Sequence, residues 1–511
     1  MRTRTVPGAG AIGRWLLATV VAVVGLGFVT GTAVAAPTAT PTPAAPGVPS
    51  TAEILGWTTD LVDLGPRRTG TPGGRRAADY VADHFRRFGL QDVHFEEATS
   101  YRWQAERHGL RVGGTAFDSF PSQHSFIGGP TWTGRFSTGP GGRSAELVDV
   151  GDGDASGFGG KDVRGKIVLF NLRFQVPNLL LALVMEHLFD PQLSLFTEPE
   201  TVLQANPYLT NYVTALNRAQ AAGAVGFVGV LADYFDSNRY HNEYYRRQPV
   251  TVPGLWVTAG VGAQIRSRLR DGQRQATIDL EGDRRAVTAR TVVGALPGSS
   301  RETIMIQSHH DSIGPGAVED ATGTAEVLAL AKRFGAEPAG RRRKTLLFTT
   351  FDSHFTGYQS HEAFVRKYLW ARSTPYDIVA NVTLEHIARN GRVKDGRLLV
   401  TDKPEPRGVF RGAGLATWPI VNQAIAEHGL DRTLTLSAAT LGGMPTDADP
   451  IYRAGGVPTI SLISGPVYMY DDLDTIDKVH VPSLRPVAAA FSQVVDRMDA
   501  LSKAQLREPP H

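Results

Sequence analysis

The sequence between residues 304 and 365 decides the fold, because two apolar strands there each end in side chains that can bind a metal. It reads IMIQSHHDS (304–312), GPGAVEDATG (314–323) and LLFTTFDSHF (346–355). The apolar runs predict buried strands, and Thr322-Gly323 predicts the start of a helix that reaches about Phe334. Imidazoles and carboxylates at the carboxyl ends of neighbouring parallel strands occupy the usual active-site position of an open α/β sheet. The stretch therefore predicts an α/β fold with a mostly parallel sheet, helices on both faces and a site at this edge.

These segments resemble the signatures of the di-zinc aminopeptidases of the peptidase M28 kind. In that family the signatures read His-x-Asp, Gly-Ala-x-Asp-Asn-x-x-Gly and Glu-Glu. Here the first is intact at His309 and Asp311, the second carries Glu319 in place of Asp, and the third is replaced by His354-Phe355. The resemblance implies a zinc-exopeptidase-like fold, while the replacements predict an altered site.

The N-terminal residues have the pattern of a secretory signal peptide. Arg2, Arg4 and Arg14 precede an apolar run, Trp15–Val29, which is followed by Ala33-Val34-Ala35. The run is short for a bilayer span, so a retained membrane anchor is the less favoured alternative. We therefore expect cleavage after residue 35, secretion by a bacterial-type export route and no stable membrane insertion afterwards.

Composition excludes several classes of function and ligand. Removal of residues 1–35 leaves 50 basic and 50 acidic residues, so no basic excess favours nucleic acid as a partner. The chain contains no Cys, which excludes disulfides and thiolate ligands. Any metal must therefore be bound by His and carboxylate side chains.

The 511 residues exceed one ordinary domain. The region after Thr131 resembles a protease-associated (PA) domain inserted in the peptidase, through Gly165-Lys166-Ile167-Val168 and a later Val252-Pro253. Within it, Leu179–Phe189 predicts a lid or a buried helix, with membrane contact as a weaker alternative. The expected organisation is a signal peptide (1–35), an Ala/Pro/Thr-rich linker (36–50), a first peptidase part (51–130), the PA-like insertion (131–286) and a second peptidase part (287–505).

The resemblance also implies roles for individual residues. His309, Glu319 and Glu385 fall on the ligand positions of one family zinc ion, and Asp311 falls on the residue that orients the histidine. His354 occupies the position of the general base, where it acts as base or, alternatively, as a fourth ligand. Three protein ligands and one open position are what a catalytic zinc requires.

The second metal position lacks its own ligands. Phe355 stands at one of them, and Tyr470 stands where the family has a histidine. We therefore expect one zinc ion rather than two. His386, next to Glu385, is expected to point to the opposite face of a strand and to be structural.

Two classes of function remain open. The first is a secreted zinc-dependent exopeptidase that removes N-terminal residues from a peptide or protein substrate. The alternative is a catalytically inactive homologue that uses the same scaffold to bind proteins or peptides. A glutaminyl-cyclase-like single-zinc enzyme, which has a similar fold, ranks last because it would need the metal position that is missing here.

Overall fold

The computed structural model describes residues 47–129, 132–177, 181, 184–242 and 249–507. The predicted signal peptide (1–35) and most of the predicted linker (36–50) lie outside the described residues. The first described helix is α2 (Thr51–Asp63), whose N-cap Ser50 accepts a hydrogen bond from the backbone N–H of Glu53. In the described ranges, no helix is both long and apolar enough to cross a membrane.

A mixed β-sheet forms the centre of the fold, which confirms the predicted α/β class. Four strands are parallel neighbours in the order β14, β13, β15, β20, and the sheet continues through β18, β19 and β8. The bounds are β14 (Thr345–Phe351), β13 (Glu302–His309), β15 (Asp377–Leu384), β20 (Thr459–Ser464), β18 (Arg407–Gly412), β19 (Thr433–Ser437) and β8 (Met185–Phe189). Every residue of β14 is buried, as the apolar run predicted, because helices cover both sides of the sheet.

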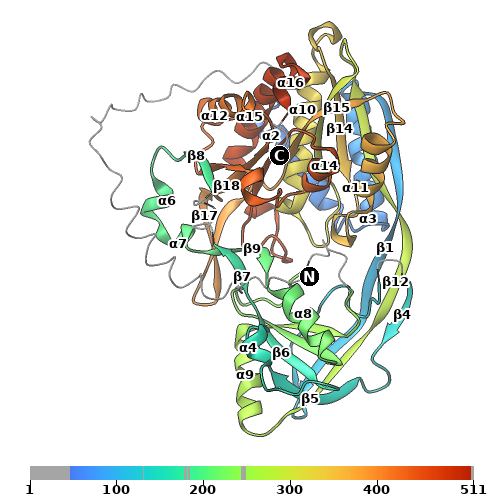
Figure 1. Cartoon of the computed structure of the whole chain (residues 1–511), viewed down its shortest axis with the longest axis vertical. Coiled ribbons are helices and arrows are strands. Elements are labelled where there is room, and N and C mark those ends of the chain that lie inside the picture. The colour runs from blue at the N-terminus through green and yellow to red at the C-terminus, as the bar shows by residue number, and fades with distance from the viewer. Residues whose placement is uncertain (1–46, 130–131, 178–180, 182–183, 243–248, 508–511) are drawn as a thin grey trace, which may run out of the picture. The chain divides into compact units, whose positions relative to one another are not determined.

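Two sets of helices cover the faces of this sheet (Figure 1). The larger set, together with α2, comprises α3 (Pro72–Arg87), α10 (Gly323–Gly335), α12 (Thr417–Glu427), α15 (Val481–Ala500) and the short α16 (Lys503–Leu506). The opposite face packs against α11 (Gln359–Phe364), its continuation η4 (Val365–Trp370) and α14 (Asp449–Gly455). Along β13, Ile304 and Ile306 face the first set and Met305 faces the second, as strand alternation requires.

Two long antiparallel strands lead from this sheet to a second group of strands. β1 (Gln91–Val112) pairs with β12 (Gln275–Leu296), and β12 also pairs with β14 and with β5 (Arg143–Asp149). From β5 the order continues to β6 (Ile167–Leu172), β10 (Gly226–Leu231), β11 (Gly254–Thr258) and β3 (Phe120–Pro121).

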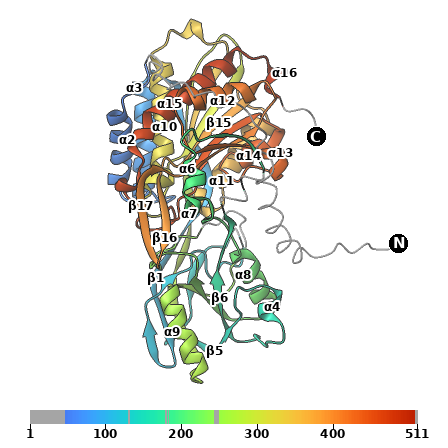
Figure 2. The ribbon, with the colours of Figure 1, turned by 90° about the vertical axis from the view of Figure 1, so that its left-hand side faces the viewer.

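Helices α8 (Tyr212–Ala221) and α9 (Ala259–Arg270) pack against this second group of strands, as Figure 2 shows. Short elements complete it: α4 (Ala155–Phe158), β2 (Thr115–Phe117), β4 (Gly134–Ser137), and the pair β7 (Phe174–Pro177) and β9 (Ala205–Thr210). The identity of residues 131–286 as a PA-type domain stays a prediction.

The expectation of a lid or helix at Leu179–Phe189 was wrong for its described C-terminal half. Met185–Phe189 is an edge strand, β8, which pairs antiparallel with β19. The backbone groups at the open edge of β19 accept a further strand, and such pairing overrides a local helical pattern. The neighbouring α6 (Ser194–Thr197) and α7 (Pro199–Val202) are single turns.

Candidate metal centre

Histidine and carboxylate side chains from five segments meet at the carboxyl edge of the parallel strands. The segments are the end of β13, the turn η1 (Ala317–Thr322), the turn η3 (His354–Thr356), the residues after β15, and the loop before α14. The side chains that meet are His309, Glu319, His354, His386 and Asp447. Each of them is at most 4% exposed, so the cluster lies inside the protein.

Glu319 is the centre of the cluster, because imidazoles approach both of its carboxylate oxygens. Its Oε1 lies 3.5 Å from His309 Nε2 and 3.4 Å from His354 Nε2. Its Oε2 contacts His386 Nε2. The sequence predicted Glu319 and His309 as ligands of the same ion, and the structure brings these two side chains together.

The backbone around Glu319 is held by a buried carboxylate. Asp474 accepts hydrogen bonds from the N–H groups of Val318 and Glu319, at 2.8 and 2.9 Å. Gly316, with φ +59°, starts the turn, and a side chain there would meet the Glu319 carbonyl at 2.4 Å. The glycine-rich turn that the sequence showed therefore serves to place one carboxylate.

His309 and His386 are both oriented by backbone carbonyls. His309 Nδ1 lies 3.0 Å from the Asp311 carbonyl oxygen, and His386 Nδ1 lies 2.8 Å from the Ser464 carbonyl oxygen. A carbonyl only accepts, so each Nδ1 carries a proton and Nε2 is the nitrogen that faces Glu319. The Asp311 carboxylate is also 3.3 Å from His309 Nδ1, in keeping with the orienting role predicted for it.

His354 is oriented by a carboxylate instead. Its Nδ1 lies 2.8 Å from Asp447 Oδ2, and Tyr358 donates its hydroxyl to Asp447 Oδ1 at 2.7 Å. The His354 ring stacks on the His309 ring with centroids 4.1 Å apart. This pairing places His354 Nε2 at the cluster, where the sequence predicted the catalytic group.

The expectation that His386 points away from the site was wrong, whereas the ligand role expected of Glu385 stays a prediction. β15 ends at Leu384, and His386 has φ +56°, so strand alternation no longer determines its direction. Its N–H donates to Asp320 Oδ1, which holds the ring at the cluster. Glu385 instead accepts a hydrogen bond from the backbone N–H of Asp447 and does not join His309 and Glu319.

The charges of the cluster depend on one another. Burial disfavours ionised His309, but Asp447 and the hydrogen bond to Asp311 outweigh it and hold the pKa of His309 well above its usual range. Burial likewise opposes charge on His386, yet Glu319 raises the pKa of His386 to about 10. These cations in turn hold the pKa of Glu319 below its ordinary value in spite of burial. The ionised Glu319 carboxylate and the protonated imidazoles around it thus favour one another's charged forms.

Phe355 and Tyr470, at the two positions where the family resemblance implied ligands, contact other aromatic rings. Phe355 is buried, with its ring centroid 6.3 Å from that of His309. Tyr470 is also buried and packs its ring against Tyr240. Both therefore pack as apolar or aromatic side chains where the family resemblance implied ligands.

A divalent transition metal fits the residues present. Within the described residues, two groups have ligand atoms close enough to share an ion: His309, Glu319 and His386, and His309, His354 and Asp447. His309 Nε2 and Glu319 Oε1 are buried without a well-formed hydrogen bond. Such buried polar atoms are costly unless another partner satisfies them. Imidazole and carboxylate are suitable ligands for zinc.

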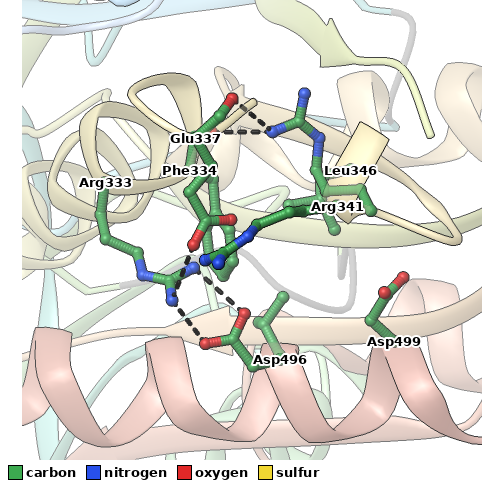
Figure 3. A pocket seen from close by; sticks show the side chains of 9 residues that line it. Arg333, Phe334, Glu337, Arg341, Leu346, Asp496 and Asp499 are labelled. Atoms are coloured by element: carbon green, nitrogen blue, oxygen red, sulfur yellow. Dashed lines mark hydrogen bonds and ion pairs between the residues drawn. The ribbon is translucent and has the colours of Figure 1, made fainter. Parts of the chain in front are cut away.

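A hollow of about 380 Å³ elsewhere in the protein is lined by arginine and carboxylate side chains and by no histidine. It lies at the other end of α10, between Arg333, Glu337 and Arg341 on one side and Asp496 and Asp499 on the other (Figure 3). Its arginine and carboxylate groups are equal in number and largely bind one another or backbone carbonyls. Size alone therefore does not mark the functional site.

The chain is similar in sequence to an aminopeptidase and to a carboxypeptidase. The chain is 26% identical over 282 residues to a probable lipoprotein aminopeptidase, LpqL, of Mycobacterium tuberculosis, covering 54% of this chain and 46% of the relative. It is 24% identical over 340 residues to carboxypeptidase Q of Mus musculus, covering 62% of each. The chain thus spans about half to three-fifths of the length of these curated relatives.

A solved structure and a family model extend the comparison. The structure of a zinc aminopeptidase from Bacillus subtilis superposes with a TM-score of 0.61 at 17% identity, covering 90% of this chain and 99% of that one. Residues 291–495 match the model of peptidase family M28. This segment contains β13, η1, β14 and β15, and hence the whole cluster around Glu319. The part of the chain that carries the cluster is therefore the part that is similar to peptidase family M28.

Proposed function

We propose that this chain is a secreted, zinc-dependent exopeptidase that removes N-terminal residues from peptides with a single metal ion. The observation that carries the proposal is the buried convergence of imidazoles on Glu319 at the carboxyl edge of an M28 sheet. The names of the relatives, among them aminopeptidases, support a peptide substrate. The signal-peptide pattern of residues 1–35 supports export.

The site residues have two roles, to bind the ion and to transfer a proton. His309 and Glu319 hold the ion, and Asp311 keeps His309 in the ligating tautomer. When bound, zinc supplies Lewis-acid activation of water and of the scissile carbonyl. His354 accepts the proton of the attacking water at Nε2, and Asp447 at Nδ1 stabilises the imidazolium that forms.

Activity on a panel of N-terminal aminoacyl substrates tests this proposal directly. The purified full chain with zinc should release N-terminal residues, a chelator should abolish the activity, and added zinc should restore it. His354→Gln should lower kcat by about 10²–10⁴-fold, the range for loss of a general base, while the protein keeps its zinc. Tyr470→Phe is the matched control, because it removes only a hydroxyl at the position where the family has a ligand histidine, and it should change neither property.

A binding scaffold is the second candidate, favoured by the burial of the cluster. None of the five cluster side chains is more than 4% exposed, so a substrate can reach them only if the covering segments open. Zinc-loaded protein that hydrolyses no member of a broad panel would refute the peptidase proposal. Peptide binding by that same inactive protein would establish the scaffold in its place.

A further inference from the structure

Two histidines face the two carboxylate oxygens of Glu319, and the Nδ1 of each is hydrogen-bonded to a backbone carbonyl. His309 Nε2 faces Oε1, and His386 Nε2 faces Oε2. Each ring donates a hydrogen bond from Nδ1 to a backbone carbonyl, of Asp311 in one case and of Ser464 in the other. Backbone carbonyls do not titrate, so both rings are held in the tautomer that ligates through Nε2.

Glu385, the side chain expected at this position, is directed elsewhere. Its Oε1 accepts a hydrogen bond from the Asp447 backbone N–H at 3.2 Å. Among the described residues, the ligand atoms of His309, Glu319 and His386 lie close enough together to share one ion, and Glu385 is not in that group. The side chain that faces Glu319 from this segment is therefore the imidazole of His386 and not the carboxylate of Glu385.

We infer that one divalent transition-metal ion is held by His309, Glu319 and His386, with His386 and not Glu385 as the third ligand. Two imidazoles and one carboxylate form a ligand set that proteins use for catalytic zinc and for other first-row ions. With no Cys in the chain, a soft thiolate site is excluded, and the two nitrogen ligands disfavour magnesium and calcium. The inference concerns the metal set alone and holds whether or not the proposed peptidase activity does.

A matched pair of neighbouring variants tests the assignment. His386→Gln removes the imidazole, and Glu385→Gln keeps an oxygen that can accept from the Asp447 N–H. Zinc affinity, measured by calorimetric titration of the metal-free full chain with zinc chloride, should fall more than about 100-fold in His386→Gln. It should fall less than about 100-fold in Glu385→Gln, because loss of a partner outside the ligand set costs about 10–100-fold.

X-ray absorption at the zinc edge of the wild-type protein provides a measurement that needs no variant. Scattering from the bound ion should show two imidazoles per zinc and no sulfur, with one zinc per chain by elemental analysis. Magnesium chloride at the same concentration should not compete. An imidazole count other than two, or a larger loss in Glu385→Gln than in His386→Gln, would overturn the assignment. Circular dichroism of both variants separates loss of the ion from loss of the fold.

Discussion

The two ends of helix α10 carry clusters of charged side chains that differ in how their charges are satisfied. At the N-terminal end, Glu319 is buried and faces His309 and His386. About 20 Å away, at the C-terminal end, Arg333 binds Asp496 through two hydrogen bonds, of 3.1 and 2.5 Å. The second cluster borders an open hollow, whereas the first is enclosed.

The difference shows which property distinguishes a candidate site from a stabilising ion pair. Around Arg333 a cation pairs with anions, because its terminal nitrogens contact the carboxylates of Glu337 and Asp496. Around Glu319 the imidazole nitrogens face carboxylate oxygens, and the pair His309 Nε2 and Glu319 Oε1 lacks a well-formed hydrogen bond. The convergence of buried imidazole and carboxylate atoms, rather than volume or charge count, therefore indicates the metal centre.

Removal of the metal should produce the largest change in the free energy of unfolding. This change should depend only on residues at the N-terminal end of α10. Zinc at about 1,000 times its Kd should raise the free energy of unfolding by about 4 kcal/mol, because it binds the folded state alone. His309→Ala should abolish this increment, whereas Arg333→Ala should leave it intact. Chemical denaturation with and without a chelator measures it. An equal loss in both variants would remove the distinction between the two clusters.

A third buried carboxyl group, Glu405, differs from both clusters, because the groups that hydrogen-bond to it are uncharged. It accepts from the Asn390 side chain and the Gly391 N–H, and burial raises its pKa to about 7. Since the unfolded chain releases this proton more readily, the contribution to stability is full below about pH 4.5 and is lost as the pH rises through about 7. Between about pH 4 and about pH 8 the loss should be about 3 kcal/mol.

Glu405→Gln isolates this contribution, because glutamine has the same shape and does not titrate. Urea denaturation across this pH range should show wild-type stability falling by about 3 kcal/mol relative to the variant. Parallel pH profiles for the two proteins would mean that Glu405 is not held neutral by burial.

The smallest effect is expected at the C-terminal end of α10. Asp496 is 44% exposed at its side chain, so solvent screens its pairing with Arg333. A double-mutant cycle with Arg333→Ala and Asp496→Ala should give a coupling of about 1 kcal/mol, reduced by added salt. Zinc affinity should not change in either variant. A change in zinc affinity would show that the two ends of the helix are coupled.

Much of the frame around the centre was predictable from local sequence. The predicted helix from Thr322-Gly323 to about Phe334 is α10, Gly323–Gly335, and the apolar run before His309 is the buried strand β13. Local rules succeed here because strand burial and the glycine-rich turn act over a few residues. The ligand roles of His309 and Glu319 and the base role of His354 stay predictions.

What the sequence by itself determined is that a histidine, a carboxylate and a second histidine would meet at one edge of an α/β sheet. Only the tertiary structure decided which neighbour of the pair Glu385 and His386 joins them. Strand alternation sets side-chain direction only while the backbone is extended, and β15 ends before this pair. Beyond that end, Asp320 and the Ser464 carbonyl, both far away in the chain, bind His386 and turn its ring toward Glu319.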